Sequence, residues 1–344
     1  MIHFECDYTE GAHPNIIKRL TETNMMQTCG YGEDEICESA RNKIKKAIGN
    51  QKADVHFLVG GTQANLTVID AILRPYQGVL SAVSGHINVH ETGAVEACGH
   101  KVLVLDSEDG TISGEQVREY MERHLHDSSR EHTVQPGMVY ISFPTENGTL
   151  YSKKQLRELY KVCCHYHLPL FIDGARLGYG LMSPENDCTL KDIAKYSDVF
   201  YIGGTKVGAL FGEAVVIVNN DLKKDFRYMI KQKGGMLAKG RLLGIQFDEL
   251  FENNLYFDIS KHAIDLAMEI KQACREAHLD LAYESFTNQQ FVLLNDEQVK
   301  KLEEDFVVSH IERKGDMNVI RLCTSWATTK ENVDLLIAKL KELC

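Results

Sequence analysis

Several features that mark particular classes of protein are scarce or missing in this sequence. The 344 residues contain six prolines, and no two of the ten cysteines form a C-x-x-C pair. Scattered cysteines without that spacing indicate reduced thiols in a cytosolic protein rather than a disulfide framework or a zinc ribbon. The apolar runs are mostly strand-sized, whereas a helix that crosses a bilayer needs about 20 apolar residues. These absences predict a cytoplasmic protein with no membrane partner.

Positive charge is also in short supply. Asp and Glu number 49 against 38 Lys and Arg, which gives a formal net charge of −11. Because nucleic acids are bound by basic faces, this balance argues against nucleic acid as a partner. Residues 1–7 have neither the basic start nor the apolar core of a secretory signal. The remaining composition, 44% hydrophobic and 25% charged, is typical of a soluble globular enzyme.

The length of the chain favours two domains of unequal size, because a single core rarely spans so many residues. Residues 1–34 are punctuated by glycine and proline and predict an irregular N-terminal arm. Residues 35–240 predict a large α/β domain. Residues 241–344 predict a linking helix and a small C-terminal α+β domain.

Strands and helices alternate through the first two thirds of the chain. We predict strands at 54–59, 79–83, 101–105, 138–142, 168–172, 200–203 and 213–218, and helices at 35–48, 63–73, 86–98, 113–126 and 152–167, the last with Ser152 as N-cap. In the C-terminal part we predict strands at 291–294, 306–311 and 319–323 and a closing helix at 331–343. Continuous apolar strands between helices are typical of a mostly parallel sheet covered on both faces.

Two charged residues each follow a buried strand. Asp173 ends Leu168–Asp173 and Lys206 follows Phe200–Gly203, and small residues come next in both cases. Open α/β sheets bind ligands beyond the carboxyl ends of their strands. A carboxylate at a pyridinium nitrogen and a lysine that forms a Schiff base are the groups that pyridoxal phosphate (PLP) needs. Taken singly, Asp173 is as well read as a helix cap and Lys206 as a solvated lysine.

The turn Gly61–Thr62 ends a strand and opens a helix. Its backbone N–H groups and the helix dipole would cradle a phosphate. The alternative is a glycine-rich turn in which Thr62 only caps the helix. Neither a Walker loop nor a dinucleotide fingerprint is present, because GK[ST] and G-x-G-x-x-G are both missing.

His86 and His90 are spaced i, i+4 in a segment that we predict to be helical. That spacing allows a metal site on one helix face, although the HExxH motif is absent. A histidine that lines a ring-binding pocket and a buried, hydrogen-bonded histidine are the other interpretations. We expect no metal.

Arg176 and Arg321 are candidates for binding a substrate carboxylate. A guanidinium forms a planar bidentate pair with a carboxylate, which lysine cannot match. Arg176 lies three residues beyond Asp173, and Arg321 lies between apolar neighbours in a predicted strand. For each arginine the alternative is a structural salt bridge.

Together these motifs resemble the low-specificity L-threonine aldolases, in the β-eliminating lyase group of the fold type I PLP-dependent enzymes. The resemblance follows the chain in order and covers Tyr31–Asp34, Gly61–Asn65, His86 with Glu91–Gly93, Asp173–Arg176, Thr205–Lys206, Gly234–Met236 and Val319–Leu322. It implies the aspartate-aminotransferase-like fold, with a mostly parallel seven-stranded sheet and a smaller C-terminal domain.

The resemblance also implies roles for the residues of the cofactor site. Lys206 would form the Schiff base with PLP, and Asp173 would pair with the pyridine nitrogen. His86 would stack on the ring, and Gly61 and Thr62 would hold the phosphate.

Other roles implied by the resemblance concern the substrate and the assembly. Arg176 and Arg321 would bind the carboxylate of an amino-acid substrate, with Arg176 at the edge of the cofactor site. Tyr31 is similar to the tyrosine with which family members reach a neighbouring subunit's site, so we expect a homodimer or homotetramer with shared active sites.

The sequence departs from the family pattern at several positions. Glu146 stands where a histidine usually precedes Asn-Gly, and Cys6–Asp7 replaces a Ser-Asp pair that would contact the substrate carboxylate. Leu237 replaces an arginine that often follows Gly-Gly-Met, and the loop after Lys206 is about two residues shorter than usual.

The sequence therefore predicts a PLP-dependent aldolase that cleaves the Cα–Cβ bond of L-threonine, L-allo-threonine or a related β-hydroxy-α-amino acid to glycine and an aldehyde. The base that takes the hydroxyl proton is either His86 or Glu146. Other fold type I enzymes, namely a β-eliminating lyase, an aminotransferase or a racemase, are alternatives. So are a non-catalytic protein that binds a small phosphorylated ligand and a metal-dependent lyase that uses His86 and His90.

Overall fold

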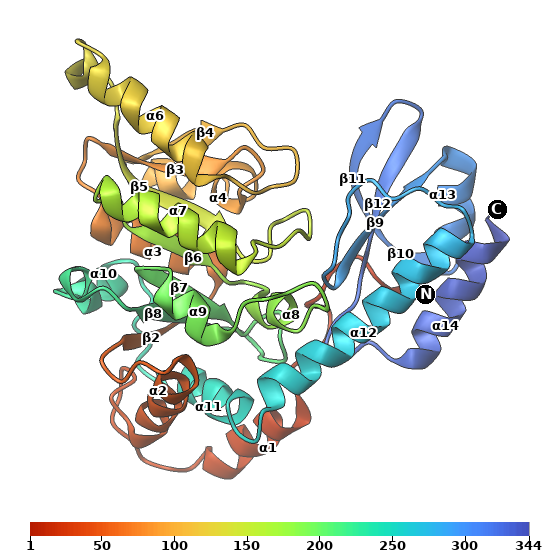
Figure 1. Ribbon diagram of the computed structural model, residues 1–344. Helices are drawn as coiled ribbons and strands as arrows, with labels where there is room; N and C mark the ends of the chain where they lie inside the picture. The colour runs from red at the N-terminus through yellow and green to blue at the C-terminus, as the bar shows by residue number, and fades with distance from the viewer. Residues whose placement is uncertain (344) are drawn as a thin grey trace.

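The computed structural model describes residues 1–343 and is organised around a seven-stranded sheet (Figure 1). The strand order is β2-β8-β7-β6-β5-β3-β4. The strands are β2 (Asp54–Leu58), β3 (Gln77–Ala82), β4 (Lys101–Leu105), β5 (Gln135–Ser142), β6 (Leu170–Asp173), β7 (Val199–Gly203) and β8 (Glu213–Ile217). Strand β8 runs antiparallel to both neighbours and the other pairs are parallel, which confirms the predicted mostly parallel sheet.

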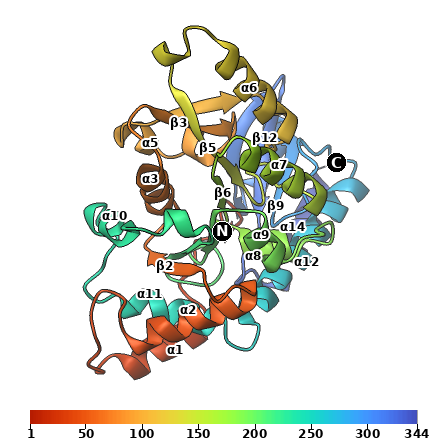
Figure 2. The same ribbon diagram turned by 60° about the vertical axis from the view of Figure 1, so that its left-hand side comes forward.

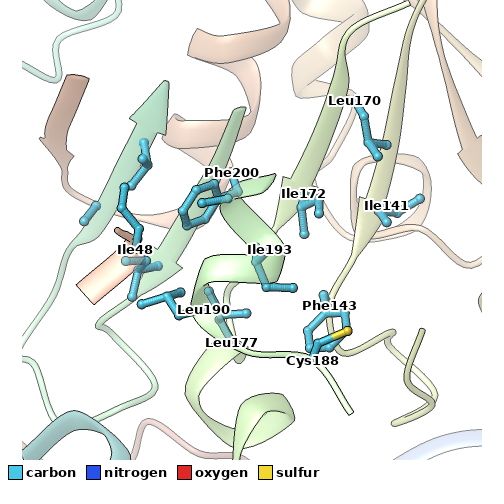
Figure 3. Packing of buried hydrophobic residues seen from close by; sticks show 14 of the residues in the cluster. Ile48, Ile141, Phe143, Leu170, Ile172, Leu177, Cys188, Leu190, Ile193 and Phe200 are labelled. Carbon is cyan, nitrogen blue, oxygen red and sulfur yellow. The ribbon is translucent and has the colours of Figure 1, made fainter. Parts of the chain in front are cut away.

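Helices cover both faces of this sheet. They are α1 (Pro14–Thr23), α2 (Glu35–Ile48), α3 (Gly61–Ile72), α4 (His86–Val89), α5 (Ala94–Ala97), α6 (Gly114–His126), α7 (Lys153–His165), α8 (Leu177–Leu181), α9 (Leu190–Lys195), α10 (Phe226–Gln232), α11 (Arg241–Leu250) and α12 (Leu255–Glu276). Figure 2 shows α3 and α10 on one side of the strands and α7, α8 and α9 on the other. On the second side, Ile141, Ile172 and Phe200 from neighbouring strands pack with Ile193 of α9 (Figure 3).

The bounds of α2 follow directly from its sequence. The side chain of Asp34 caps the helix by accepting a hydrogen bond from the backbone N–H of Cys37 at 2.9 Å. Gly49 ends it in the left-handed region with φ 69°, which glycine adopts without steric cost. The buried stripe is Ile36, Ala40, Ile44 and Ile48. The predicted helix over 35–48 is confirmed.

The C-terminal part has its own sheet and core. Strands β9 (Gln289–Leu294), β12 (Met317–Cys323) and β11 (Ser309–Lys314) form an antiparallel sheet that α13 (Asp296–Leu302) and α14 (Lys330–Glu342) accompany. Figure 1 shows α12 running from the large sheet to this part, where it lies beside α14. The N-terminus joins the same part, since β1 (Ile2–His3) pairs in parallel with β10 (Phe306–Val307).

Three predictions about local structure are wrong. The first 34 residues are not irregular throughout, because Pro14 starts α1 at a position that needs no N–H donor. The segment 86–98 forms two short helices, since Thr92 (φ 54°) and Gly93 (φ 70°) break it. The predicted strand 306–311 is divided between β10 and β11, which belong to different sheets.

The other predicted strands and helices are present with small shifts of their ends, and Ser152 caps α7 in a capping box with Gln155. None of the helices within residues 1–343 combines the length and the apolar character that a bilayer crossing requires.

Candidate active site

A cavity of about 340 Å³ opens at the carboxyl ends of β5, β6 and β7. Most of the residues that the sequence singled out line it, namely Gly61, Thr62, His86, Glu146, Asp173, Arg176 and Lys206. Asp173 is the last residue of β6, and Lys206 follows β7 by three residues. Two strands that are adjacent in the sheet therefore deliver a carboxylate and an amino group to one space, as predicted.

Asp173 is a buried carboxylate that four donors hold in place. Its Oδ2 accepts from the Tyr140 hydroxyl at 2.6 Å and the Asn65 amide at 3.0 Å, while Oδ1 accepts from the Ala175 N–H at 2.9 Å and the Tyr201 hydroxyl. Burial by itself would raise the pKa of Asp173. The electrostatic influence of the nearby His86 ring and these hydrogen bonds outweigh burial, so the pKa of Asp173 lies below its ordinary value. Asp173 is therefore a fixed anion at neutral pH.

Lys206 is held in a setting that favours the free amine. Burial and the nearby guanidinium of Arg176 lower the pKa of Lys206, and Asp7 and Asp173 oppose this only in part. Its backbone is anchored because the Tyr179 hydroxyl donates to the Lys206 carbonyl at 2.6 Å. A lysine with a lowered pKa is a nucleophile suited to forming a Schiff base.

His86 is oriented by a buried carboxylate. Its Nδ1 lies 2.7 Å from Oε1 of Glu91, whose side chain is inaccessible to solvent. That same oxygen accepts from the Asn65 amide at 2.7 Å, and Asn65 also bonds Asp173. A carboxylate at Nδ1 keeps the ring proton there and leaves Nε2 as the acceptor. The Asn65 amide thus connects Asp173 to Glu91, which in turn holds the His86 ring, so His86 and Asp173 are fixed relative to each other.

The first turn of α3 can receive an anion. Gly60 is its N-cap and offers no side chain to bond the first N–H groups, which stay available to a ligand. A Cβ at Gly61 would lie 3.2 Å from the Tyr201 hydroxyl, so a side chain there would crowd the cavity. Gly61 and Thr62 therefore form a small, uncapped cradle.

These features fit the predicted cofactor. A carboxylate for the pyridine nitrogen, a nucleophilic amine, an imidazole at the cavity wall and an uncapped helix N-terminus for the phosphate all border one space of suitable size. Among residues 1–343, by contrast, no group of three or more His, Cys, Asp or Glu side chains is placed to hold a metal ion.

Glu146 is half-buried at the wall of the cavity. Its Oε1 accepts from the Ser142 hydroxyl at 2.6 Å and from the His86 backbone N–H at 2.9 Å. Burial raises the pKa of Glu146 above its ordinary value. The carboxyl group therefore touches the backbone of His86, and it is more easily protonated than an exposed glutamate.

Arg176 forms the salt bridge that the sequence left open as an alternative. Its Nε and Nη2 donate to the two carboxylate oxygens of Asp7 at 2.7 and 3.0 Å. The Asn288 amide also donates to Asp7, at 2.9 Å. Burial would raise the pKa of Asp7, but Arg176 and then Lys206 lower it below its ordinary value. In the described part of the chain Arg176 Nη1 has no hydrogen-bond partner, so this nitrogen is left for a ligand.

Asp7 and three other predicted site residues do not line the cavity. Arg321 donates from Nη2 to the Glu5 carbonyl at 2.7 Å and from Nη1 to Gln289 at 3.1 Å. Cys6 lies close to Arg321, and burial raises the pKa of its thiol. Tyr31 is 47% exposed and borders a separate small cavity, with its ring centroid 4.9 Å from Lys231 Nζ.

Some residues of the site carried no assigned role in the sequence analysis. Tyr140 and Tyr201 lie within apolar strands, where a buried hydroxyl requires a partner, and that requirement was the available signal. Asn65 lies in a recognised motif and connects Asp173 to Glu91. Glu213, the first residue of β8, is 3% exposed and also lines the cavity. Its signal was a charged residue at the start of an apolar strand.

Residues 5–322 match the model of the beta-eliminating lyase family. The solved structure of Leishmania major threonine aldolase superposes with a TM-score of 0.97 at 42% sequence identity, covering 100% of this chain and 99% of that chain. The low specificity L-threonine aldolase of Pseudomonas sp. (strain NCIMB 10558) is 28% identical over 264 residues, which are 76% of this chain and 74% of that protein.

A more distant likeness concerns the fold alone. The structure of a Thermus thermophilus aspartate aminotransferase double mutant superposes with a TM-score of 0.71 at 14% sequence identity. The superposition covers 100% of this chain and 92% of that chain. The predicted aspartate-aminotransferase-like fold is thereby confirmed.

Proposed function

The chain belongs to the beta-eliminating lyase family, and from this premise we propose that it cleaves the Cα–Cβ bond of L-threonine, L-allo-threonine or a related β-hydroxy-α-amino acid to glycine and an aldehyde. The predicted resemblance to threonine aldolases is confirmed by the matches to such enzymes. The observation that carries the proposal is the placement of Asp173 and Lys206 in one cavity with the uncapped start of α3.

Pyridoxal phosphate, when bound, supplies the electron sink that accepts the pair released by the breaking bond. Asp173 would face the pyridine nitrogen, where its fixed negative charge favours the protonated ring. Lys206 would carry the cofactor and exchange protons at Nζ. Gly61 and Thr62 would hold the phosphate, and His86 would lie against the ring.

The substrate carboxylate would be bound beside Arg176. With Nε and Nη2 bonded to Asp7, Arg176 keeps a fixed direction and offers Nη1. Arg321 would supply a second guanidinium, and Cys6 and Asp7 would border this subsite. Asp7 acts here by orienting Arg176 and not by touching the substrate.

His86 is the group that we propose as base toward the β-hydroxyl. Glu91 holds the proton on Nδ1, which leaves Nε2 able to accept one. Glu146 remains the alternative base, but its Oε1 already accepts hydrogen bonds from the Ser142 hydroxyl and the His86 N–H. The role of Glu146 in this proposal is to fix the backbone of His86.

We also propose a cytoplasmic homodimer or homotetramer with shared active sites. Tyr31 would complete the site of a neighbouring subunit, and its exposure in the single chain supports this role. The division into an arm over 1–34, a large domain over 35–240 and a small domain over 241–344 is part of the same proposal.

The function is tested by products and by the cofactor bond. Purified protein with PLP and L-threonine, without any keto acid, is expected to release glycine and acetaldehyde. Lys206→Ala should lose the visible absorption of the bound cofactor and about 10³-fold or more of the turnover. Lys224→Ala, which removes an exposed lysine, is the matched control.

Two results would contradict the proposal: a colourless wild-type protein, or normal turnover by Lys206→Ala. The alternatives within the fold are separated by the same assay. An aminotransferase needs a keto acid, a racemase yields the other enantiomer, and a β-eliminating lyase yields a keto acid and ammonia instead of glycine.

A further inference from the structure

Glu213 is a buried carboxyl group at the anion-binding end of the cavity that the proposed reaction does not use. In the sheet it lies opposite Leu58 at the end of β2 and Gly203 at the end of β7. Val215 and Ile217 alternate with it along β8, and both belong to the cluster that packs against α3. Because side chains two residues apart share a face of a strand, Glu213 points to the side of α3, near that helix's first turn.

The partners of Glu213 are neutral donors. Thr205 donates its hydroxyl to Oε1 at 2.9 Å, and the backbone N–H of Gly204 donates to Oε2 at 3.2 Å. No Lys, Arg or His of residues 1–343 lies within ion-pair distance of this carboxyl group. A buried carboxyl group without a cationic partner favours its neutral form.

The charged and titratable groups around Glu213 come from several elements. Lys206 beyond β7 lowers its pKa, and Asp173 at the end of β6 raises it. Tyr201 on β7 and Tyr256 on α12 add no charge, because burial keeps both as neutral phenols. The charged residue of α3, Asp70, forms ion pairs with Lys233 and His100 and is not among the groups that shift the pKa of Glu213.

Among these influences burial is the largest, and it raises the pKa of Glu213 to about 8. An anion at the start of α3 would bring further negative charge to the same end of the cavity. Two like charges that share a buried site cannot both persist, so the weaker acid takes up a proton.

We propose that Glu213 belongs to the phosphate subsite as a neutral carboxylic acid, and that binding of a phosphate ester is coupled to uptake of one proton from solvent by Glu213. This inference rests on the proposed function, which places the phosphate of the cofactor at Gly61 and Thr62. Above the pKa of free Glu213, affinity for the phosphorylated ligand then falls up to about tenfold for each pH unit, because a proton must be bound first.

The coupling is tested by isothermal titration calorimetry of the full chain freed of cofactor. The probe is pyridoxine 5′-phosphate, which carries the ring and the phosphate but no aldehyde, so Lys206 cannot react with it. Titration in two buffers of different ionisation enthalpy gives the protons taken up. At pH 8.5 the wild type should take up roughly 0.8 proton more on binding pyridoxine 5′-phosphate than on binding pyridoxine, which lacks the phosphate.

Glu213→Gln keeps the size of the side chain and cannot titrate, so this phosphate-dependent uptake should disappear and the affinity for pyridoxine 5′-phosphate should change with pH only as the affinity for pyridoxine does. Glu146→Gln, which alters the other glutamate that lines the cavity, should retain the uptake. Protonation of the pyridine nitrogen is common to all variants and cancels in the comparison of the two ligands.

Equal uptake for pyridoxine and its phosphate in the wild type overturns the inference without any variant, so a misfolded Glu213→Gln protein does not leave the question open. Equal uptake by the wild type and Glu213→Gln overturns it as well. Failure of the proposed function is distinguishable, because the wild type with PLP would then release no glycine and acetaldehyde from L-threonine.

Discussion

The two ends of the cavity present buried carboxyl groups that behave in opposite ways. Asp173 at the ring end is 4% exposed and Glu213 at the anion end is 3% exposed, so burial alone does not distinguish them. Asp173 has four donors and a lowered pKa, whereas Glu213 has two donors and a raised one. The number of donors and the nearby charge, rather than depth, decide whether a buried carboxyl group remains ionised.

The largest effect is expected when the charge at the ring end is removed. Asp173→Asn replaces an anion by a neutral amide, so a positive charge at the pyridine nitrogen loses its partner, and turnover should fall about 10²- to 10³-fold. Steady-state kinetics with saturating PLP measures this. Asp127→Asn, at an exposed carboxylate bonded to Ser129, is the control and should retain activity. Full activity of Asp173→Asn would show that the two ends do not differ in charge.

The converse change at the anion end should appear in stability. Because the pKa of Glu213 rises from 4.5 to about 8 on folding, the folded state binds the extra proton, and stability is lost as pH rises through this window. Glu213→Gln removes that loss. The difference in unfolding free energy between the variant and the wild type should therefore shift in favour of the variant by about 2 kcal/mol between pH 6 and pH 8. Urea unfolding of the cofactor-free protein at both pH values measures it. Parallel profiles for the two proteins would refute the raised pKa.

Removal of one donor to the ionised carboxylate should have an intermediate effect. Tyr201→Phe leaves Asp173 charged and buried with one hydrogen bond fewer, which should cost about 1.5–3 kcal/mol of unfolding free energy at pH 7. The loss should shrink as pH falls through the lowered pKa of Asp173, because the stabilisation by a depressed carboxyl pKa is present only above it. Tyr140→Phe should behave in the same way. A cost that does not change with pH would mean that the hydroxyl does not bond a charged group.

The smallest effect is expected when a hydrogen-bond donor is removed from Glu213 at the anion end of the cavity. Thr205→Val removes a donor to Glu213, which is neutral at pH 6, and also the acceptor of the Gly212 N–H at 3.0 Å. The share of the cost that belongs to the bond to Glu213 is expected to be about 0.5–1.5 kcal/mol. The same unfolding assay compares it with Tyr201→Phe. If both substitutions cost the same at pH 6, the contrast between a charged and a neutral acceptor is absent.

Local patterns were enough to place the principal groups. Asp173 and Lys206 were predictable because each follows a continuous apolar strand and parallel neighbours end at the same edge. The helix over 35–48 was predictable because its cap and its apolar stripe are contiguous in sequence. In these cases the physical cause lies within about a dozen residues, a span that helix and strand periodicity covers.

Contacts between distant segments could not be predicted in this way. The pairing of Arg176 with Asp7 depends on the docking of β1 on β10, and β10 is far from both residues in sequence. The position of Glu213 depends on β8 being antiparallel, which fixes its register beside the start of α3. The break after His86 depends on Thr92, whose left-handed backbone no propensity indicates.

The pairing of β1 with β10 has a consequence for how the protein is made. Asp7 leaves the ribosome well before β10 does, yet β1 is anchored by Phe306 and Val307, and the Phe4 carbonyl accepts from the Cys323 N–H at 2.8 Å. Residues 2–4 therefore cannot dock until residues 306–323 have been synthesised. Arg176 acquires its partner only after that point, so a nascent chain stalled before residue 306 carries an unfinished pocket.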